Sequence, residues 1–93
     1  MHIAVQTFRL RIPGADSLKA KRAVVKSLKA KLRQRFNLSV AETGMQDVHQ
    51  VAELSVAVIA DGRAGADSVL DAVDAMVEGD GRALIEHTQR EFR

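Results

Sequence analysis

Residues 51–62 read VAELSVAVIADG and contain the clearest secondary-structure pattern of the chain. Leu54, Val56 and Val58 alternate with smaller or polar residues, and a period of two is typical of a strand that buries one face. The Asp-Gly pair that follows is a turn signal and ends the strand. We therefore predict a strand over Val51–Ala60, in the interior of a sheet.

The segments on either side of this strand have different periods. On its N-terminal side, a turn that contains Gly44 and Asp47 connects it to a shorter predicted strand over Leu38–Thr43. On its C-terminal side, the spacing of apolar residues predicts a helix from about Ala64 to Glu78. Gly79 is expected to end that helix. The apolar stripe of the helix consists of Val69, Leu70, Val73, Met76 and Val77.

The outer segments complete the pattern. Residues 2–12 are predicted to form a strand whose alternation changes phase near Gln6, which implies either a bulge or two partly buried faces. After a Pro-Gly turn, Asp16 and Ser17 are N-cap candidates for a helix from Leu18 to about Phe36. A last strand is predicted over about Ala83–Phe92, and its poor alternation indicates a sheet edge.

The predicted order of elements is therefore βαββαβ. This is the ferredoxin-like pattern of the α+β class, with four antiparallel strands in the order 4-1-3-2 and two helices on one face. The length of 93 residues accommodates one such domain, covering residues 1–93.

Composition excludes several classes of function. The chain has no Cys, so it has no disulfide framework, thiolate metal site or cysteine nucleophile. Its longest apolar run, Val56–Ala60, is far too short to cross a bilayer, and no signal peptide is recognisable. We expect a cytoplasmic protein without a membrane partner.

Charge is strongly segregated along the chain. The first 36 positions hold ten of the 14 Lys and Arg residues but only one of the 12 acidic residues. A one-sided basic surface is the electrostatic signature of a protein that binds a polyanion. On the first predicted helix, a stripe within an arc of about 80° carries half of these ten basic residues. We call it the basic stripe, and it consists of Lys19, Arg22, Lys26, Lys29 and Arg33.

The second predicted helix carries the opposite charge. Its acidic stripe consists of Asp67, Asp71, Asp74 and Glu78. With both helices on one side of the sheet, the rotation of each stripe away from the apolar face turns the two stripes to opposite outer flanks. The flanks that face each other are expected to pack closely, because apart from Lys31 they hold small residues: Ala20, Ser27, Ser68, Ala72 and Ala75.

Candidate chemical sites are weak. Glu42, Asp47, His49 and Glu53 surround one hairpin, but their spacing matches no known metal-ligand pattern, so a polar turn is favoured over a metal site. Gly79-Asp80-Gly81 has neither the third glycine nor the strand-to-helix context of a dinucleotide fingerprint. With only three aromatic residues, a sheet that stacks RNA bases is not indicated. We expect no enzyme activity, catalytic residue, cofactor or metal.

Several stretches of the chain resemble the YlxP-like family of small bacterial proteins. They are IPGADSLKAKR at 12–22, VVKSL at 24–28, FNLSVAE at 36–42, QD at 46–47 and VAV at 56–58. The resemblance implies a ferredoxin-like fold. It also implies a context in translation, since family members are often encoded beside translation initiation and ribosome-binding factors.

Two positions depart from the family pattern. Ala20 stands where a Glu is usual, which removes the capping-box partner of Ser17. Val48-His49 replaces a common Leu-Trp pair in the hairpin, which puts any partner contact of that aromatic residue in doubt.

Three functional hypotheses remain open. The leading one is a non-enzymatic accessory protein that binds RNA or a ribosomal subunit through the basic stripe, with the amides near Ser17 as an additional anion site. The second is a self-assembling module, a homodimer formed through the sheet or through opposite flanks. The third is a regulatory domain that senses a small molecule.

Overall fold

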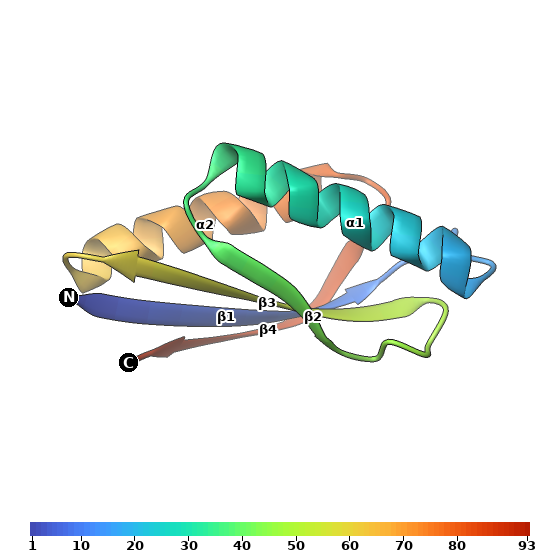
Figure 1. Cartoon of the computed structure of the whole chain (residues 1–93), viewed down its shortest axis with the longest axis horizontal. Coiled ribbons are helices and arrows are strands. Elements are labelled where there is room, and N and C mark those ends of the chain that lie inside the picture. The colour runs from blue at the N-terminus through green and yellow to red at the C-terminus, as the bar shows by residue number, and fades with distance from the viewer.

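The computed structural model describes all 93 residues and has the predicted order of elements (Figure 1). The strands pair antiparallel in the order β2-β3-β1-β4, which is the predicted order read from the other edge. The elements are β1 (His2–Arg11), α1 (Leu18–Arg35), β2 (Ser39–Gly44), β3 (Val51–Ala60), α2 (Arg63–Gly79) and β4 (Leu84–Phe92).

The element boundaries lie within about one residue of those predicted from the sequence, and β4 is an edge strand as expected. α2 ends at Gly79, one residue beyond the predicted last residue, and Asp80 is its C-cap. The backbone reverses at Gly81, whose φ of 83° lies in the left-handed region that glycine adopts without steric cost.

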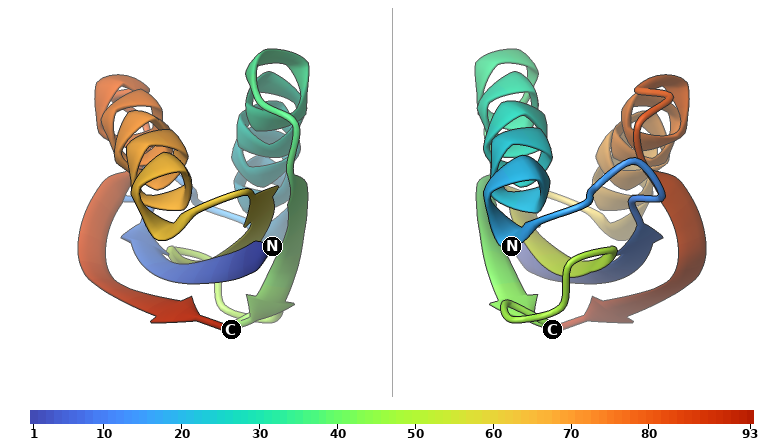
Figure 2. Two further views of the ribbon diagram at one scale, coloured as in Figure 1. Left: turned by 90° about the vertical axis from the view of Figure 1, so that its left-hand side faces the viewer. Right: turned by 90° about the vertical axis from the view of Figure 1, so that its right-hand side faces the viewer.

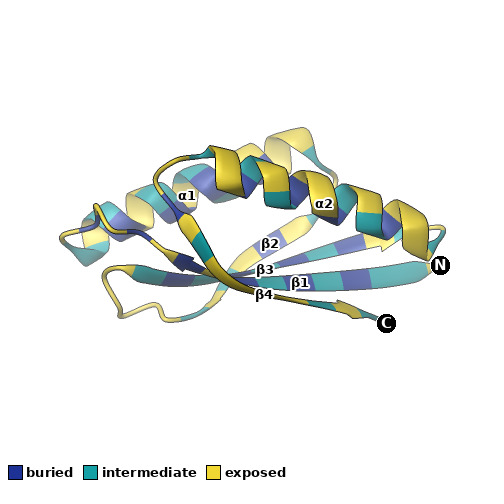
Figure 3. Ribbon diagram, turned by 180° about the vertical axis from the view of Figure 1, so that it is seen from behind, coloured by how far each residue is buried: buried dark blue, intermediate teal, exposed yellow.

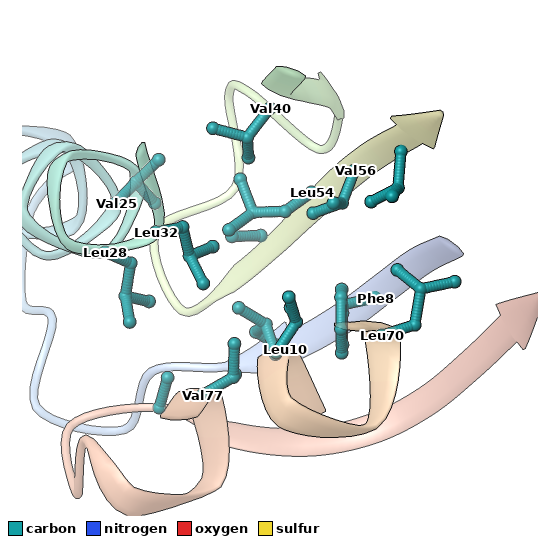
Figure 4. Close-up of a cluster of buried hydrophobic side chains, with 14 of the residues drawn as sticks. Phe8, Leu10, Val25, Leu28, Leu32, Val40, Leu54, Val56, Leu70 and Val77 are labelled. Carbon is teal, nitrogen blue, oxygen red and sulfur yellow. The ribbon is translucent and has the colours of Figure 1, made fainter. Parts of the chain in front are cut away.

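Both helices lie on one face of the sheet, and the other face is uncovered (Figure 2). Eighteen buried hydrophobic residues fill the space between the helices and the sheet, with Phe8, Leu28, Leu54 and Leu70 among the largest (Figure 4). Burial alternates along β1 and β3, whereas β4 is mostly exposed (Figure 3). Neither helix combines the length and the apolar composition needed to cross a membrane.

The phase change in β1 corresponds to two partly buried faces. The strand pairs with β3 without interruption from His2 to Arg11, so no bulge occurs in that pairing. Its register with β4 shifts instead between Arg9 and Leu10. Gln6 occupies a core-facing position and is only 1% exposed. Ile3 and Val5 consequently lie on the uncovered face.

The expected close packing of the two helices is wrong. They stand apart above the sheet (Figure 2), and Ala72 and Ala75 are exposed. The intervening groove has a volume of ≈ 450 Å³, and Lys31 and Asp80 are among the residues that line it. A strongly twisted sheet separates the helices that cover it. Polar side chains bridge the gap, including Arg82, whose Nη2 donates to Ser27 Oγ over 3.0 Å.

A buried lysine holds α1 to the β2–β3 hairpin. Lys21 is 0% exposed, and its Nζ donates to the carbonyls of Met45 (2.6 Å), Gln46 (3.3 Å) and Val51 (3.2 Å). These bonds use the three donors of an ammonium. Glu42 Oε2 lies 3.2 Å from the same Nζ and compensates its charge as an ion pair without a directed hydrogen bond.

We expect Lys21→Ala to lower the free energy of unfolding by about 3 kcal/mol, because it leaves a carboxylate and three carbonyls without their partner in a buried setting. Lys26→Ala, which removes an exposed lysine from the same helix, is the control and should change stability by less than about 0.5 kcal/mol. Urea unfolding followed by circular dichroism measures both. Equal unfolding midpoints for the two variants would contradict a structural role for Lys21.

Candidate nucleic-acid interface

The basic stripe lies on the outer flank of α1, next to β2. Four of its residues, Arg22, Lys26, Lys29 and Arg33, line a groove of ≈ 450 Å³ together with Glu42 of β2. Lys19 lies near the start of the helix, outside the groove lining, and is exposed. The fold therefore brings four of the five predicted residues to one concave surface.

The cations of this groove are not neutralised within the chain. Lys19, Arg22, Lys26 and Lys29 take part in no ion pair. Arg33 donates from Nη2 to the Val40 carbonyl over 3.0 Å, which fixes its guanidinium against β2 but leaves its charge uncompensated. The one carboxylate in the lining, Glu42, is the partner of buried Lys21.

Ser17 caps α1. Its Oγ accepts the Ala20 N–H over 3.1 Å, and its carbonyl accepts the Lys21 N–H over 3.1 Å. The hydroxyl is therefore engaged in the helix cap. The N–H groups of the first two helical residues, Leu18 and Lys19, have no acceptor within a helix.

The acidic stripe lies on the opposite flank and does not contact the basic stripe. Arg90 of β4 extends under α2, and its guanidinium reaches Asp67 (2.7 Å), Asp71 (3.1 Å) and Asp74 (3.2 Å). Arg90 Nε also donates to Gln6 Oε1 over 2.6 Å, and Gln6 Nε2 donates to Asp74. The acidic flank is thus partly neutralised, and burial raises the pKa of Asp74.

The contact between Gln6 and Arg90, which are 84 positions apart, was not predicted from the sequence. The only signal for Gln6 was the break in apolar alternation along its strand. Arg90 gave no signal, because the weak alternation of β4 did not show which of its side chains turn toward α2.

Lys31, the charged residue on the inner flank of α1, forms an ion pair with Asp80. Its Nζ lies 3.2 Å from Asp80 Oδ2, and Arg82 Nη2 lies 2.7 Å from the same oxygen. The Asp80 side chain is 1% exposed, and hydrogen bonds from Arg82 hold its pKa far below the ordinary value of 3.8. The turn after α2 is thereby tied to the middle of α1.

The polar hairpin residues do not form a metal centre. Glu42 is turned toward Lys21, and Glu53 Oε2 accepts the Thr43 hydroxyl over 3.1 Å. Asp47 and His49 are exposed, and nowhere do three or more His, Asp or Glu side chains gather as a metal site requires.

Comparison with known proteins identifies the family. The model of DUF503, described as a protein of unknown function, matches residues 3–90. The chain belongs to this family. It is also similar to the uncharacterized protein YlxP of Bacillus subtilis (strain 168), with 34% identity over 67 residues that cover 72% of this chain and 73% of that protein.

Solved structures agree on the fold. A de novo designed protein with a ferredoxin fold aligns over 100% of this chain and 85% of its own, with a TM-score of 0.57 and 20% identity. Protein Atu4242 from Agrobacterium tumefaciens aligns over 100% and 91%, with a TM-score of 0.56 and 13% identity. These similarities confirm the ferredoxin-like architecture.

The Asp80 cluster predicts an acid-labile component of stability. Because the pKa of Asp80 is lowered on folding, its contribution is present above about pH 4 and is lost as the pH falls below that value. We expect Asp80→Asn to lower the free energy of unfolding at neutral pH and to reduce its further loss on acidification. Asp47→Asn, in the exposed hairpin, is the control and should change the free energy of unfolding at neutral pH by less than about 0.5 kcal/mol. Parallel profiles for native protein and Asp80→Asn in urea unfolding would contradict the assignment.

Proposed function

We propose that this protein is a cytoplasmic, non-enzymatic RNA-binding accessory factor that contacts RNA phosphates through the groove between α1 and β2. The observation that carries the proposal is the uncompensated charge of that groove. Arg22, Lys26, Lys29 and Arg33 line it, and the carboxylate beside them is already paired with Lys21.

The contrast with the other lysines of α1 supports a role for these cations in binding. Lys21 and Lys31 each have a carboxylate partner within the chain. The basic stripe instead keeps like charges at helical spacings of three and four, and each such pair costs about 0.2–0.5 kcal/mol. A polyanion in the groove would offset this cost and release its own counterions.

The shape of the surface favours contact with the nucleic-acid backbone over base recognition. From Lys19 to Arg33 the stripe extends about 21 Å along the helix axis, enough to contact several successive phosphates. Aromatic platforms for bases are not part of it. Phe8 is 1% exposed in the core, and Phe92 lies under Arg63 on the far flank. Phe36, at the end of α1, packs against the core with Arg35 over its ring. We therefore propose binding that is strongly salt-dependent and tolerant of RNA sequence.

Ribosomal RNA is the RNA we propose to test first, because the resemblance to YlxP-like proteins implies a context in translation. The free N–H groups of Leu18 and Lys19 at the start of α1 would donate hydrogen bonds to a further phosphate at the end of the stripe. No catalytic group or cofactor is invoked for this function.

The double variant Lys26→Glu/Lys29→Glu should lose most of its affinity for purified ribosomal subunits and for structured ribosomal RNA fragments. Each phosphate contact removed should also reduce the slope of log affinity against log salt by about 1. Fluorescence anisotropy over a range of KCl concentrations measures both quantities.

The control is Arg63→Glu/Arg93→Glu, which changes net charge equally and should retain the native affinity and slope. Arg63 begins α2 and Arg93 lies beside the uncovered face of the sheet, so both are outside the groove lining. If both double variants weaken binding to the same degree, net charge alone controls binding, and the groove is not the site. If native protein does not bind RNA even at low salt, the proposal fails.

A further inference from the structure

The uncovered face of the sheet has an apolar end and no covering element. Ile59 is 69% exposed there, and Ile3, Val5 and Ala57 are only partly buried. Both helices lie on the opposite side (Figure 2). Cross-strand pairs on the two central strands arrange this face in rows: Ile3 with Ile59, Val5 with Ala57, Thr7 with Ser55, and Arg9 with Glu53.

We propose that this face binds the same face of a second copy, about a two-fold axis that runs along the strands between β1 and β3. Such an axis places β1 of one copy over β3 of the other, because β1 and β3 are the two central strands. Each of these β1 residues then lies over its own row partner on β3 of the other copy. The four kinds of contact are isoleucine with isoleucine, valine with alanine, threonine with serine, and arginine with glutamate. A two-fold interface requires this self-complementarity.

Charge supports this arrangement. Arg9 is exposed and makes no ion pair within the chain, although Glu53 lies opposite it on the neighbouring strand. Glu53 Oε2 accepts the Thr43 hydroxyl and has no cationic partner. In the dimer each Arg9 faces Glu53 of the other copy, so two ion pairs form across the interface.

Other arrangements of the two faces are less complementary. A two-fold axis across the strands, through the row of Thr7 and Ser55, would place Ile3 of one copy over Arg11 of the other. That contact would oppose an apolar side chain to a charge that is paired with Glu86 in the monomer. Pairing of the opposite flanks is also disfavoured, since Arg90 already neutralises part of the acidic flank.

The size of the face suits a dimer. The four strands together have 35 residues. At about 3.4 Å per residue and about 4.8 Å between strands, the flat footprint is roughly 570 Å². Standard protein–protein interfaces bury about 800 Å² of accessible surface per partner, and protruding side chains raise the accessible area above the flat footprint. The strand directions of two aligned, packed sheets differ by about 30°. The residues of matching rows therefore lie closest to each other near the centre of the interface. The groove of α1 stays free, because it lies on the other side of the sheet.

Sedimentation velocity over a range of protein concentrations tests the interface. Native protein should be dimeric at high micromolar concentration, and Ile59→Lys should raise the dimer dissociation constant by about tenfold or more, since each dimer buries two copies of the residue. Val48→Lys is the matched control, because Val48 is an exposed apolar residue of the hairpin, 42% exposed and outside the face, and should remain dimeric. A monomeric native protein, or an Ile59→Lys dimer of native affinity, would overturn the proposal.

A charge exchange tests the orientation. The substitution Arg9→Glu places a second carboxylate over Glu53 of the other copy, and Glu53→Arg places a second guanidinium over Arg9, so each variant alone should be monomeric. Circular dichroism would establish that both remain folded. An equimolar mixture should form a heterodimer, because every contact is then between opposite charges. A mixture that stays monomeric, or single variants that dimerise like native protein, would contradict the two-fold axis between β1 and β3.

Discussion

The buried ammonium of Lys21 sets the rotation of α1, and the surface of the protein depends on that rotation. Lys21 continues the apolar line of Val25, Leu28 and Leu32 into the core, where three hairpin carbonyls and Glu42 hold it. With this line turned inward, the basic stripe can point only toward β2 and solvent. The same contact anchors the β2–β3 hairpin, so one side chain fixes both walls of the basic groove.

The cations of α1 therefore divide into two groups with different roles. Lys21 and Lys31 are bound to carboxylates and hold the hairpin and the turn after α2. The basic stripe has no such partners, and its charge remains available to a ligand. On the other flank, Arg90 pairs with three carboxylates of α2, so part of the acidic charge is compensated there. This internal compensation of one flank, and not of the other, turns a net charge of +2 into a one-sided basic surface.

Most of the fold could be predicted from local periodicity, because the strand of residues 51–60 and both helices have unambiguous apolar spacing. The placement of the basic stripe on an outer flank also followed from sequence, since it depends only on helix rotation and topology. The hydrogen bonds and ion pairs of the buried polar side chains could not be predicted. Gln6 and Arg90 are in contact although 84 positions separate them in the sequence. Lys21 is buried, although lysine is ordinarily a surface residue. Its spacing of four from Val25 was the one available signal. The gap between the helices depends on the twist of the sheet. The small side chains on the facing flanks of the helices give no information about that twist.

The proposed RNA site lies on the helix side of the molecule, at the groove between α1 and β2. Titration of isotope-labelled protein with a short RNA, followed by amide chemical shifts in heteronuclear NMR spectra, locates the residues that RNA contacts. We expect salt-sensitive shifts along α1 from Lys19 to Arg33 and at the adjacent edge of β2, with the amides of α2 and β4 unchanged. Shifts centred on α2 and β4, or a spectrum that RNA does not change at low salt, would contradict it.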